Sequence, residues 1–294
     1  MSEPLKFGPP CISVDVEDWP QSTWDRTLPI SARSADNTRR ILELLDRAGV
    51  RATMFVLGKF AEKYPDVVRE IHIAGHEVAC HGYNHTEIFK QSEQAFREDV
   101  RRSRDLLEQA TGQRVAGYRA PEFSMVSETL WALTVLAEEG FAYDSSIFPV
   151  RHNRYGIPQW PPNPIRLILP GSMSIYELPI ATFRGLGANW PVGGGGYHRL
   201  LPSSMIQYFA RKVLAFAPFV FYCHPYEFDP HEFEEIAVKL PLSVRLHQGL
   251  GRRWFEQRFS AFLREFGGRK MIDLLQSDPW RTMDIAEVVP GISG

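Results

Sequence analysis

The stretch Cys11-Ile12-Ser13-Val14-Asp15-Val16-Glu17-Asp18 joins an apolar run to a cluster of carboxylates. The apolar run Cys11-Ile12-Ser13-Val14 predicts a buried β-strand over 11–16. The acidic residues that follow are then expected at the carboxyl end of that strand. This arrangement predicts a sheet whose edge carries charged side chains ready for chemistry.

The same order of an apolar strand followed by a helix recurs along the chain. Further strands are predicted over 51–57, 77–80, 115–118, 141–143, 174–180 and 219–223. Helices are predicted between them over 35–48, 59–74, 92–109, 127–138 and 203–216. Residues 148–170 predict a long ordered loop, and the aromatic tail over 243–275 predicts a packing helix. Alternating strands and helices predict an α/β fold with a parallel sheet and right-handed crossovers.

Polar residues follow five of the predicted strands. They are Asp15 to Asp18, the pair His81 and His85, Arg119, Asp144 and His224. A closed (β/α) barrel brings the carboxyl ends of its strands to one rim. An open doubly wound sheet would gather such residues at its switch point, but five contributing strands favour closure.

His81 and His85 are candidate metal ligands. Two imidazoles four residues apart lie on one face if the backbone turns helically, so both can point at one ion. A carboxylate from the 15–18 cluster would complete a set of two nitrogens and one oxygen. Such a set leaves coordination positions open, which is typical of a catalytic metal site.

The composition excludes several classes of function. The formal net charge of −2 offers no basic field for nucleic acid or an anionic membrane. No stretch approaches 18 uninterrupted apolar residues, so no integral membrane segment is expected. Residues 1–6 show no basic and apolar leader, and the three cysteines lack a metal-type spacing. We therefore expect a soluble protein of a reducing, cytoplasmic compartment.

Five segments carry a resemblance to a known family. They are Ser13-Val14-Asp15-Val16-Glu17-Asp18, His81-Gly82-Tyr83-Asn84-His85, Arg119-Ala120-Pro121-Glu122-Phe123, Tyr143-Asp144-Ser145-Ser146 and Tyr222-Cys223-His224-Pro225. In this order they resemble the five motifs of the polysaccharide deacetylase family. The chain looks closest to the branch associated with bacterial exopolysaccharide and O-antigen gene clusters.

The resemblance covers roughly residues 10–270 and implies a fold. It implies a distorted (β/α) barrel of about seven parallel strands with a C-terminal helical extension. The barrel is expected over residues 1–240 and the extension, packed on the barrel, over 241–294.

The resemblance also implies catalytic roles. Asp15 matches the catalytic base, Arg119 the arginine that orients it, and His224 the general acid. Asp144 matches the motif whose residue helps to tune that histidine. A backbone N–H just after Pro121 is expected to bind the oxyanion.

His81 and His85 match the metal-binding histidines of the family. The expected cofactor is one divalent ion, zinc first, with cobalt, nickel, manganese and iron as the other candidates. The first motif departs from the family pattern of adjacent aspartates, because Val16 follows Asp15. Strand alternation puts Glu17 on the side of Asp15, while Asp18 has the shorter side chain usual for the ligand, so both stay candidates.

The implied activity is metal-dependent hydrolysis of an N-acyl group, usually acetyl, from an amino sugar. Without a leader, the expected substrate is an N-acylated sugar or oligosaccharide precursor, nucleotide-linked or lipid-linked, in surface polysaccharide, O-antigen or lipopolysaccharide biosynthesis. Two other hypotheses stay open. One is a metal-independent amidohydrolase acting on a cyclic amide, and the other is a catalytically silent carbohydrate-binding barrel.

Overall fold

The computed structural model describes residues 6–185, 187–236, 240–276 and 280–288. The expectation that the chain has no leader concerns residues 1–6, and residues 1–5 lie outside the described part. The outer ends of the two predicted domains, 1–240 and 241–294, lie outside it as well.

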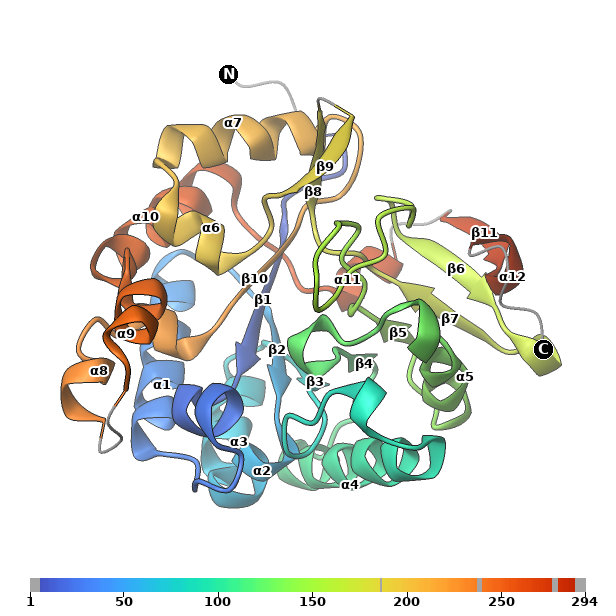
Figure 1. Cartoon of the computed structure of the whole chain (residues 1–294), viewed down its shortest axis with the longest axis horizontal. Coiled ribbons are helices and arrows are strands. Elements are labelled where there is room, and N and C mark those ends of the chain that lie inside the picture. The colour runs from blue at the N-terminus through green and yellow to red at the C-terminus, as the bar shows by residue number, and fades with distance from the viewer. Residues whose placement is uncertain (1–5, 186, 237–239, 277–279, 289–294) are drawn as a thin grey trace.

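A mostly parallel sheet forms the centre of the fold (Figure 1). Within the described residues its strands follow the order β10-β1-β2-β3-β4-β5-β7-β6-β11. The parallel strands are β10 (Val220–Cys223), β1 (Cys11–Val16), β2 (Thr53–Val56), β3 (Glu77–Cys80), β4 (Gly117–Tyr118), β5 (Tyr143–Asp144) and β7 (Ser174–Glu177). Strand β6 (Ile165–Ile168) is antiparallel to β7, and β11 (Arg281–Asp284) is parallel to β6. The predicted α/β fold with about seven parallel strands is confirmed.

The chain after β7 connects the two ends of the parallel array. The Ile180 N–H donates to the carbonyl of Ile147 at 3.1 Å, and the Ala181 N–H donates to the carbonyl of Val220 at 3.1 Å. These irregular contacts curl the sheet into a distorted barrel, as predicted, instead of an open doubly wound sheet.

Helices cover the outside of the sheet. They are α1 (Ala32–Arg47), α2 (Gly58–Lys63), α3 (Pro65–Ile73), α4 (Glu93–Thr111), α5 (Trp131–Glu138), α6 (Gly195–Leu200), α7 (Ser203–Leu214), α8 (Glu232–Glu235), α9 (Leu242–Gly249), α10 (Arg252–Phe266), α11 (Ile272–Leu275) and α12 (Ile285–Val288). Figure 1 shows α2, α3 and α4 below the strands, with α7 and the hairpin of β8 (Thr182–Gly185) and β9 (Ala188–Pro191) above them.

Local chemistry sets the ends of these helices. The Ser92 side chain caps α4 by accepting the Ala95 N–H at 3.2 Å, and Gly112 ends that helix with a φ of 67°. The predicted helix over 59–74 is instead two helices. Pro65 starts α3 and keeps Tyr64 out of the helical region, at φ −127° and ψ 56°.

Three other predicted elements differ from the structure. The predicted helix over 127–138 starts as a short 3-10 turn, and its α-helical part begins only at Trp131. The predicted loop over 148–170 contains strand β6, whose alternating burial was hidden by the polar composition around it. The single packing helix predicted over 243–275 is three helices, because Gly251 and Gly267 interrupt it with φ values of 82° and 68°.

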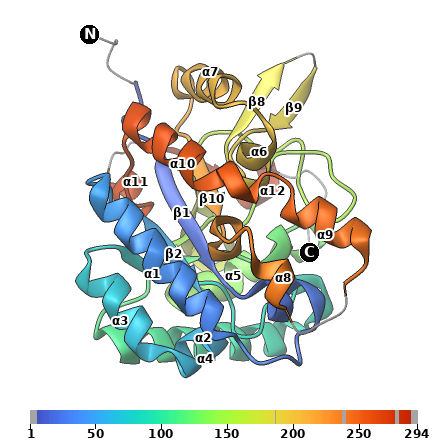
Figure 2. The same ribbon diagram turned by 90° about the vertical axis from the view of Figure 1, so that its left-hand side faces the viewer.

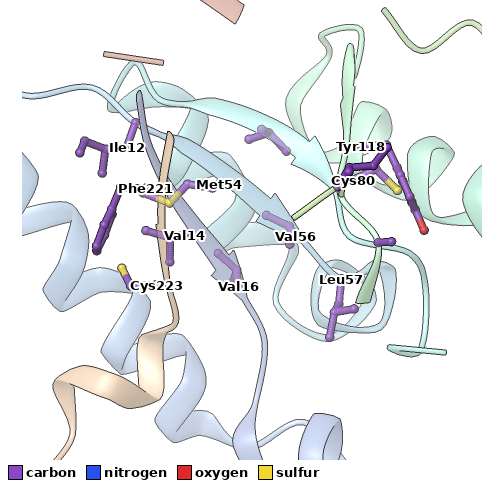
Figure 3. Close-up of a cluster of buried hydrophobic side chains, with 14 of the residues drawn as sticks. Ile12, Val14, Val16, Met54, Val56, Leu57, Cys80, Tyr118, Phe221 and Cys223 are labelled. Atoms are coloured by element: carbon purple, nitrogen blue, oxygen red, sulfur yellow. The ribbon is translucent and has the colours of Figure 1, made fainter. Parts of the chain in front are cut away.

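Strand β1 separates two regions of buried side chains. On one side, Ile12, Val14 and Val16 pack with Met54 and Val56 (Figure 3). The other side of the strand carries Ser13 and Asp15 toward the interior of the barrel, because side chains alternate along a strand. Asp15 can therefore be buried without interrupting the apolar layer beneath the helices.

The C-terminal helices are present, and α10 packs against the segment that follows β10. Helix α10 buries Phe255, Phe259 and Phe262, and the Phe255 ring lies 4.8 Å from that of Phe228. The division of the chain at residue 240 stays a prediction. No helix in the described part of the chain is long and apolar enough to cross a membrane.

Candidate active site

One cavity collects the carboxyl ends of the strands. It has a volume of about 220 Å³ and is lined by Asp15, Glu17, His81, His85 and His224, among others. Asp15 belongs to β1, and the two histidines of the 81–85 segment follow β3. His224 follows β10, and β1 lies between β10 and β2 in the sheet.

Glu17, His81 and His85 form a candidate metal site. Their ligand atoms lie within 4.8 Å of one another, and all three side chains are buried. Glu17 Oε2 is 2.6 Å from His85 Nε2 and 3.5 Å from His81 Nε2. Two imidazole nitrogens and one carboxylate oxygen are a donor set that suits a divalent transition-metal ion.

Neighbouring groups prepare these side chains as ligands. His81 Nδ1 lies 2.8 Å from the carbonyl oxygen of Arg119, to which it donates as N–H, so Nε2 is left as the free nitrogen. Burial opposes ionisation of Glu17, but the neighbouring imidazoles, the charge of His85 foremost, hold its pKa well below the usual value. The carboxylate form is the one that binds a metal ion.

Asp18, the other candidate ligand, points elsewhere. Its carboxylate accepts the Ser31 N–H at 3.0 Å and the Ser31 hydroxyl at 2.5 Å. The structure thus brings Glu17 to the histidines and uses Asp18 to hold the chain that leads into α1.

The backbone between the two histidines is not helical, contrary to the expectation from their spacing. Gly82 has a φ of 72° and His85 a φ of 55°, so the loop folds back on itself. A Cβ at Gly82 would lie 3.0 Å from Asp99 Oδ2, on a backbone that disfavours side chains. The glycine therefore permits the turn that points both imidazoles at Glu17.

Arg119 fixes Asp15. Its Nη1 donates to Asp15 Oδ1 and to Ser13 Oγ, each at 2.7 Å. Its Nε and Nη2 donate to the carbonyl and hydroxyl oxygens of Ser145, each at 3.0 Å, and its guanidinium lies 4.1 Å from the Phe55 ring centre. The fully buried arginine leaves Asp15 Oδ2 facing His224, at 4.0 Å from its Nε2.

Glu227 is the acidic neighbour of His224. His224 Nδ1 lies 3.2 Å from Glu227 Oε2. Burial disfavours a charged imidazole, but the hydrogen bond to Glu227 and the charges of Glu17 and Asp15 raise the pKa of His224 to about 9. Arg199 holds the other oxygen of Glu227, with Nε at 2.9 Å. His224 is therefore a cation at neutral pH.

Asp144 does not occupy the place expected from the family motif. It is fully buried and accepts the Ser146 hydroxyl at 2.5 Å and the Ser146 N–H at 3.2 Å. Glu177 lies beside it, and burial together with the charge of Asp144 raises the pKa of Glu177 well above its usual value. The pair holds the segment behind Arg119, since the Ala120 N–H donates to Ser146 Oγ at 2.7 Å.

The motifs in the sequence did not point to Glu227 or to Arg199, which contacts it. Pro225, directly after His224, starts a tight turn that places the Glu227 side chain against the histidine. The segment His224-Pro225-Tyr226-Glu227 could therefore have indicated an acidic partner for His224. Gly195 packs on this pair, because a Cβ there would lie 2.1 Å from Glu227 Oε2.

The segment after Arg119 also lines the cavity, through Glu122 and Phe123. Glu122 and Phe123 have φ values of 54° and 50°, which non-glycine residues rarely adopt. Within the described residues no acceptor takes the Glu122 N–H. Glu122 is the residue just after Pro121, where a donor to an oxyanion is expected.

The residues of this site fall in two segments that match different family models. Residues 9–140 match the family Polysaccharide deacetylase, and residues 145–276 match a domain of unknown function (DUF3473). Asp15, Glu17 and the residues up to Arg119 belong to the first segment. His224 and Glu227 belong to the second.

Individual relatives agree with the first match. A peptidoglycan deacetylase-like protein of Gibberella zeae is 33% identical over 110 residues, which cover 37% of this chain and 32% of that protein. A peptidoglycan-N-acetylglucosamine deacetylase of Bacillus cereus is 37% identical over 86 residues, 29% of each protein. The chain thus spans about a third of the length of these relatives.

A solved structure shares the whole fold. A crystal structure from Mycobacterium smegmatis, described as a polysaccharide deacetylase, superposes with a TM-score of 0.60 at 24% identity and covers 94% of both chains. Residues 9–140 are therefore similar to the polysaccharide deacetylase family, and residues 145–276, which carry His224 and Glu227, match DUF3473.

Proposed function

We propose that this chain hydrolyses the N-acyl group, acetyl in the first instance, of an amino sugar with one divalent metal ion, zinc before cobalt, nickel, manganese or iron. The observation that carries the proposal is one cavity holding both the Glu17, His81 and His85 set and the pair of Asp15 and His224. Amide hydrolysis requires a base, an electrophile and an acid, and this cavity contains a candidate for each.

Each group of residues in the cavity has a separate role in the proposed reaction. Glu17, His81 and His85 would hold the ion, which when bound polarises the acyl carbonyl and lowers the pKa of water. Asp15, held through Oδ1 by Arg119, takes a proton from the attacking water with Oδ2. The Glu122 N–H donates to the carbonyl oxygen as negative charge develops there.

His224 completes the reaction. The water oxygen joins the acyl carbon, the C–N bond breaks, and the amine nitrogen takes a proton from His224 Nε2. Glu227 keeps this histidine cationic, which a general acid for a poor amine leaving group requires. The products are a carboxylic acid and the free amino sugar.

We infer the substrate class from the resemblance. The Gly-Gly-Gly-Tyr segment at 194–197 and the helical C-terminal region resemble the exopolysaccharide and O-antigen branch of the family. We propose a nucleotide-linked or lipid-linked saccharide in surface polysaccharide or O-antigen assembly, handled in the cytoplasm. The Bacillus cereus relative is named a peptidoglycan-N-acetylglucosamine deacetylase, so N-acetylglucosamine oligomers are a second substrate to assay.

Metal analysis and amine release test the proposal together. The purified chain should carry one divalent ion per molecule and release free amine from N-acetylated saccharides, and chelation should abolish this release. The His81→Ala/His85→Ala variant should lose metal and activity together. Amine release that survives chelation would support a metal-independent amidohydrolase. Bound metal without release from any N-acylated saccharide would support a silent binding barrel.

A further inference from the structure

Helix α9 contributes no buried side chain to the protein. Its apolar residues Leu242 and Leu246, and Leu250 directly after it, are 69%, 62% and 59% exposed. A helix of 8 residues has little stability in water by itself and normally depends on burying an apolar face. Within the described residues, nothing covers this face.

A surface hollow gathers these side chains with a tryptophan. Leu246, Leu250 and Trp254 line it together, and Trp254, on α10, is 50% exposed. Leu242 precedes Leu246 by four residues and so lies on the same face of the helix. We call Leu242, Leu246, Leu250 and Trp254 the α9 patch. Figure 2 shows α9 at the edge of the molecule, next to α8 and the start of α10.

The charge around the α9 patch is positive. Arg245 and Arg253 line the same hollow and are exposed, and neither is paired with a carboxylate among the described residues. Glu234 also lines this hollow, with its Oε2 at 3.0 Å from His231 Nδ1, so two arginines face one carboxylate there. The net charge beside the α9 patch is therefore positive, whereas the net charge of the whole chain is −2.

We infer that the α9 patch docks the protein onto an anionic lipid surface. Leucine and tryptophan side chains partition into the headgroup region, and arginines beside them pair with lipid phosphates. A second copy of the chain fits less well as the partner. A two-fold interface would bring the same face of both copies together and so place Arg245 and Arg253 near their own counterparts.

The α9 patch borders the active-site cavity. Gln248, on α9, lines that cavity, and Arg199 donates to the carbonyl oxygens of Gln248 at 2.6 Å and of Leu250 at 3.1 Å. The same arginine holds Glu227 beside His224. If the proposed function holds, docking would bring the cavity to a saccharide carried on a lipid.

Vesicle binding without any substrate tests the inference separately from the activity. The full chain should co-sediment with vesicles of phosphatidylcholine and phosphatidylglycerol, and less with phosphatidylcholine alone. Leu246→Gln/Leu250→Gln should weaken binding about tenfold or more. Arg245→Gln/Arg253→Gln should weaken binding to the anionic vesicles by about fivefold for each arginine and leave binding to neutral ones unchanged.

The matched control removes two other exposed apolar residues, Ile73 and Phe216, which are 76% and 75% exposed. Ile73→Gln/Phe216→Gln should bind vesicles like the unmodified chain, and circular dichroism should show every variant folded. Equal weakening in both double variants, or no binding of the unmodified chain, would overturn the inference. Dimers that disappear in Leu246→Gln/Leu250→Gln, measured by sedimentation without lipid, would also overturn it.

Discussion

Asp15 and Glu17 lie two positions apart and face the same cavity, yet their neighbours give them different chemistry. Arg119 holds one oxygen of Asp15, whereas Glu17 faces the imidazoles of His81 and His85. A carboxylate among imidazoles suits a metal ion, and one held by a guanidinium with a free oxygen suits proton transfer. Asp15 in β1 and Glu17 just after that strand are thereby suited to separate roles.

Replacing Glu17 and Asp18 one at a time tests which of these two residues binds the metal ion. Glu17→Gln should lose most of its bound metal, because it removes an anionic ligand from the set that faces both histidines. Asp18→Asn should retain metal, since its carboxylate binds Ser31 instead. Metal content after dialysis measures both variants. Greater loss of metal in Asp18→Asn would make Asp18 the ligand.

Asp15→Asn tests the base without removing a ligand. The variant should fold and keep its metal, because Asp15 lies outside the Glu17, His81 and His85 set. Its rate of amine release should fall by about 10²–10⁴-fold if Asp15 is the general base. Loss of metal in proportion to loss of activity would instead identify Asp15 as a ligand.

Glu227→Gln should shift the pH dependence of activity. The hydrogen bond and charge of Glu227 help to raise the pKa of His224 to about 9, so their loss should lower it. The cationic acid is then lost at lower pH, and the alkaline limb of kcat/KM should move toward acid by about one pH unit.

Glu177→Gln is the matched control for that shift. Burial and the charge of Asp144 raise the pKa of Glu177 well above its usual value, and Glu177 Oε1 accepts the Ile147 N–H at 3.1 Å instead of contacting His224. Its substitution should leave the alkaline limb in place. An unmoved limb in Glu227→Gln would mean that His224 is not the acid observed in the profile.

At the scale of elements, helix α4 depends on its cap. Ser92 satisfies the Ala95 N–H, which has no partner within the helix. Ser92→Ala should therefore lower the free energy of unfolding by about 1 kcal/mol, measured by urea titration. Ser204→Ala, an exposed position inside α7, is the control and should cause no loss. Equal losses in both variants would contradict the capping role of Ser92.

At the scale of the whole molecule, buried neutral histidines make the fold sensitive to acid. His198 packs on Phe221 and Phe262, and burial lowers its pKa to about 4. The unfolded chain then binds more protons than the folded one between about pH 6.5 and pH 4. The stability that neutral His198 contributes is complete above this range and is lost as the pH falls through it.

His198→Phe should flatten this dependence. From pH 7 to pH 5 the unmodified protein should lose about 2 kcal/mol through His198, measured by urea unfolding at both values. Over the same pH range the variant should lose about 2 kcal/mol less stability than the unmodified protein. Part of the acid sensitivity should persist, because burial also lowers the pKa of His76 to about 4. His247→Gln, at an exposed position, should keep the original dependence. An unchanged slope in His198→Phe would exclude this histidine as a source.

The linear sequence determined the alternation of strands and helices and the positions of Asp15, His81, His85, Arg119 and His224 at strand ends. These properties are local, since periodicity and composition within a short window are enough to produce them. Parallel strands bring their carboxyl ends together, so a shared site at one rim followed from the order of elements.

Only the tertiary structure decided which neighbouring side chains meet. Glu17 and Asp18 are adjacent in sequence, but the contact of Asp18 with Ser31 leaves Glu17 to face the histidines. Glu227, and not Asp144, lies beside His224, because the turn that begins at Pro225 brings it there. The low net charge likewise gave no sign of the α9 patch, because total charge does not record where arginines and leucines gather on a surface. Such contacts depend on distances across the fold, which spacing along the chain does not specify.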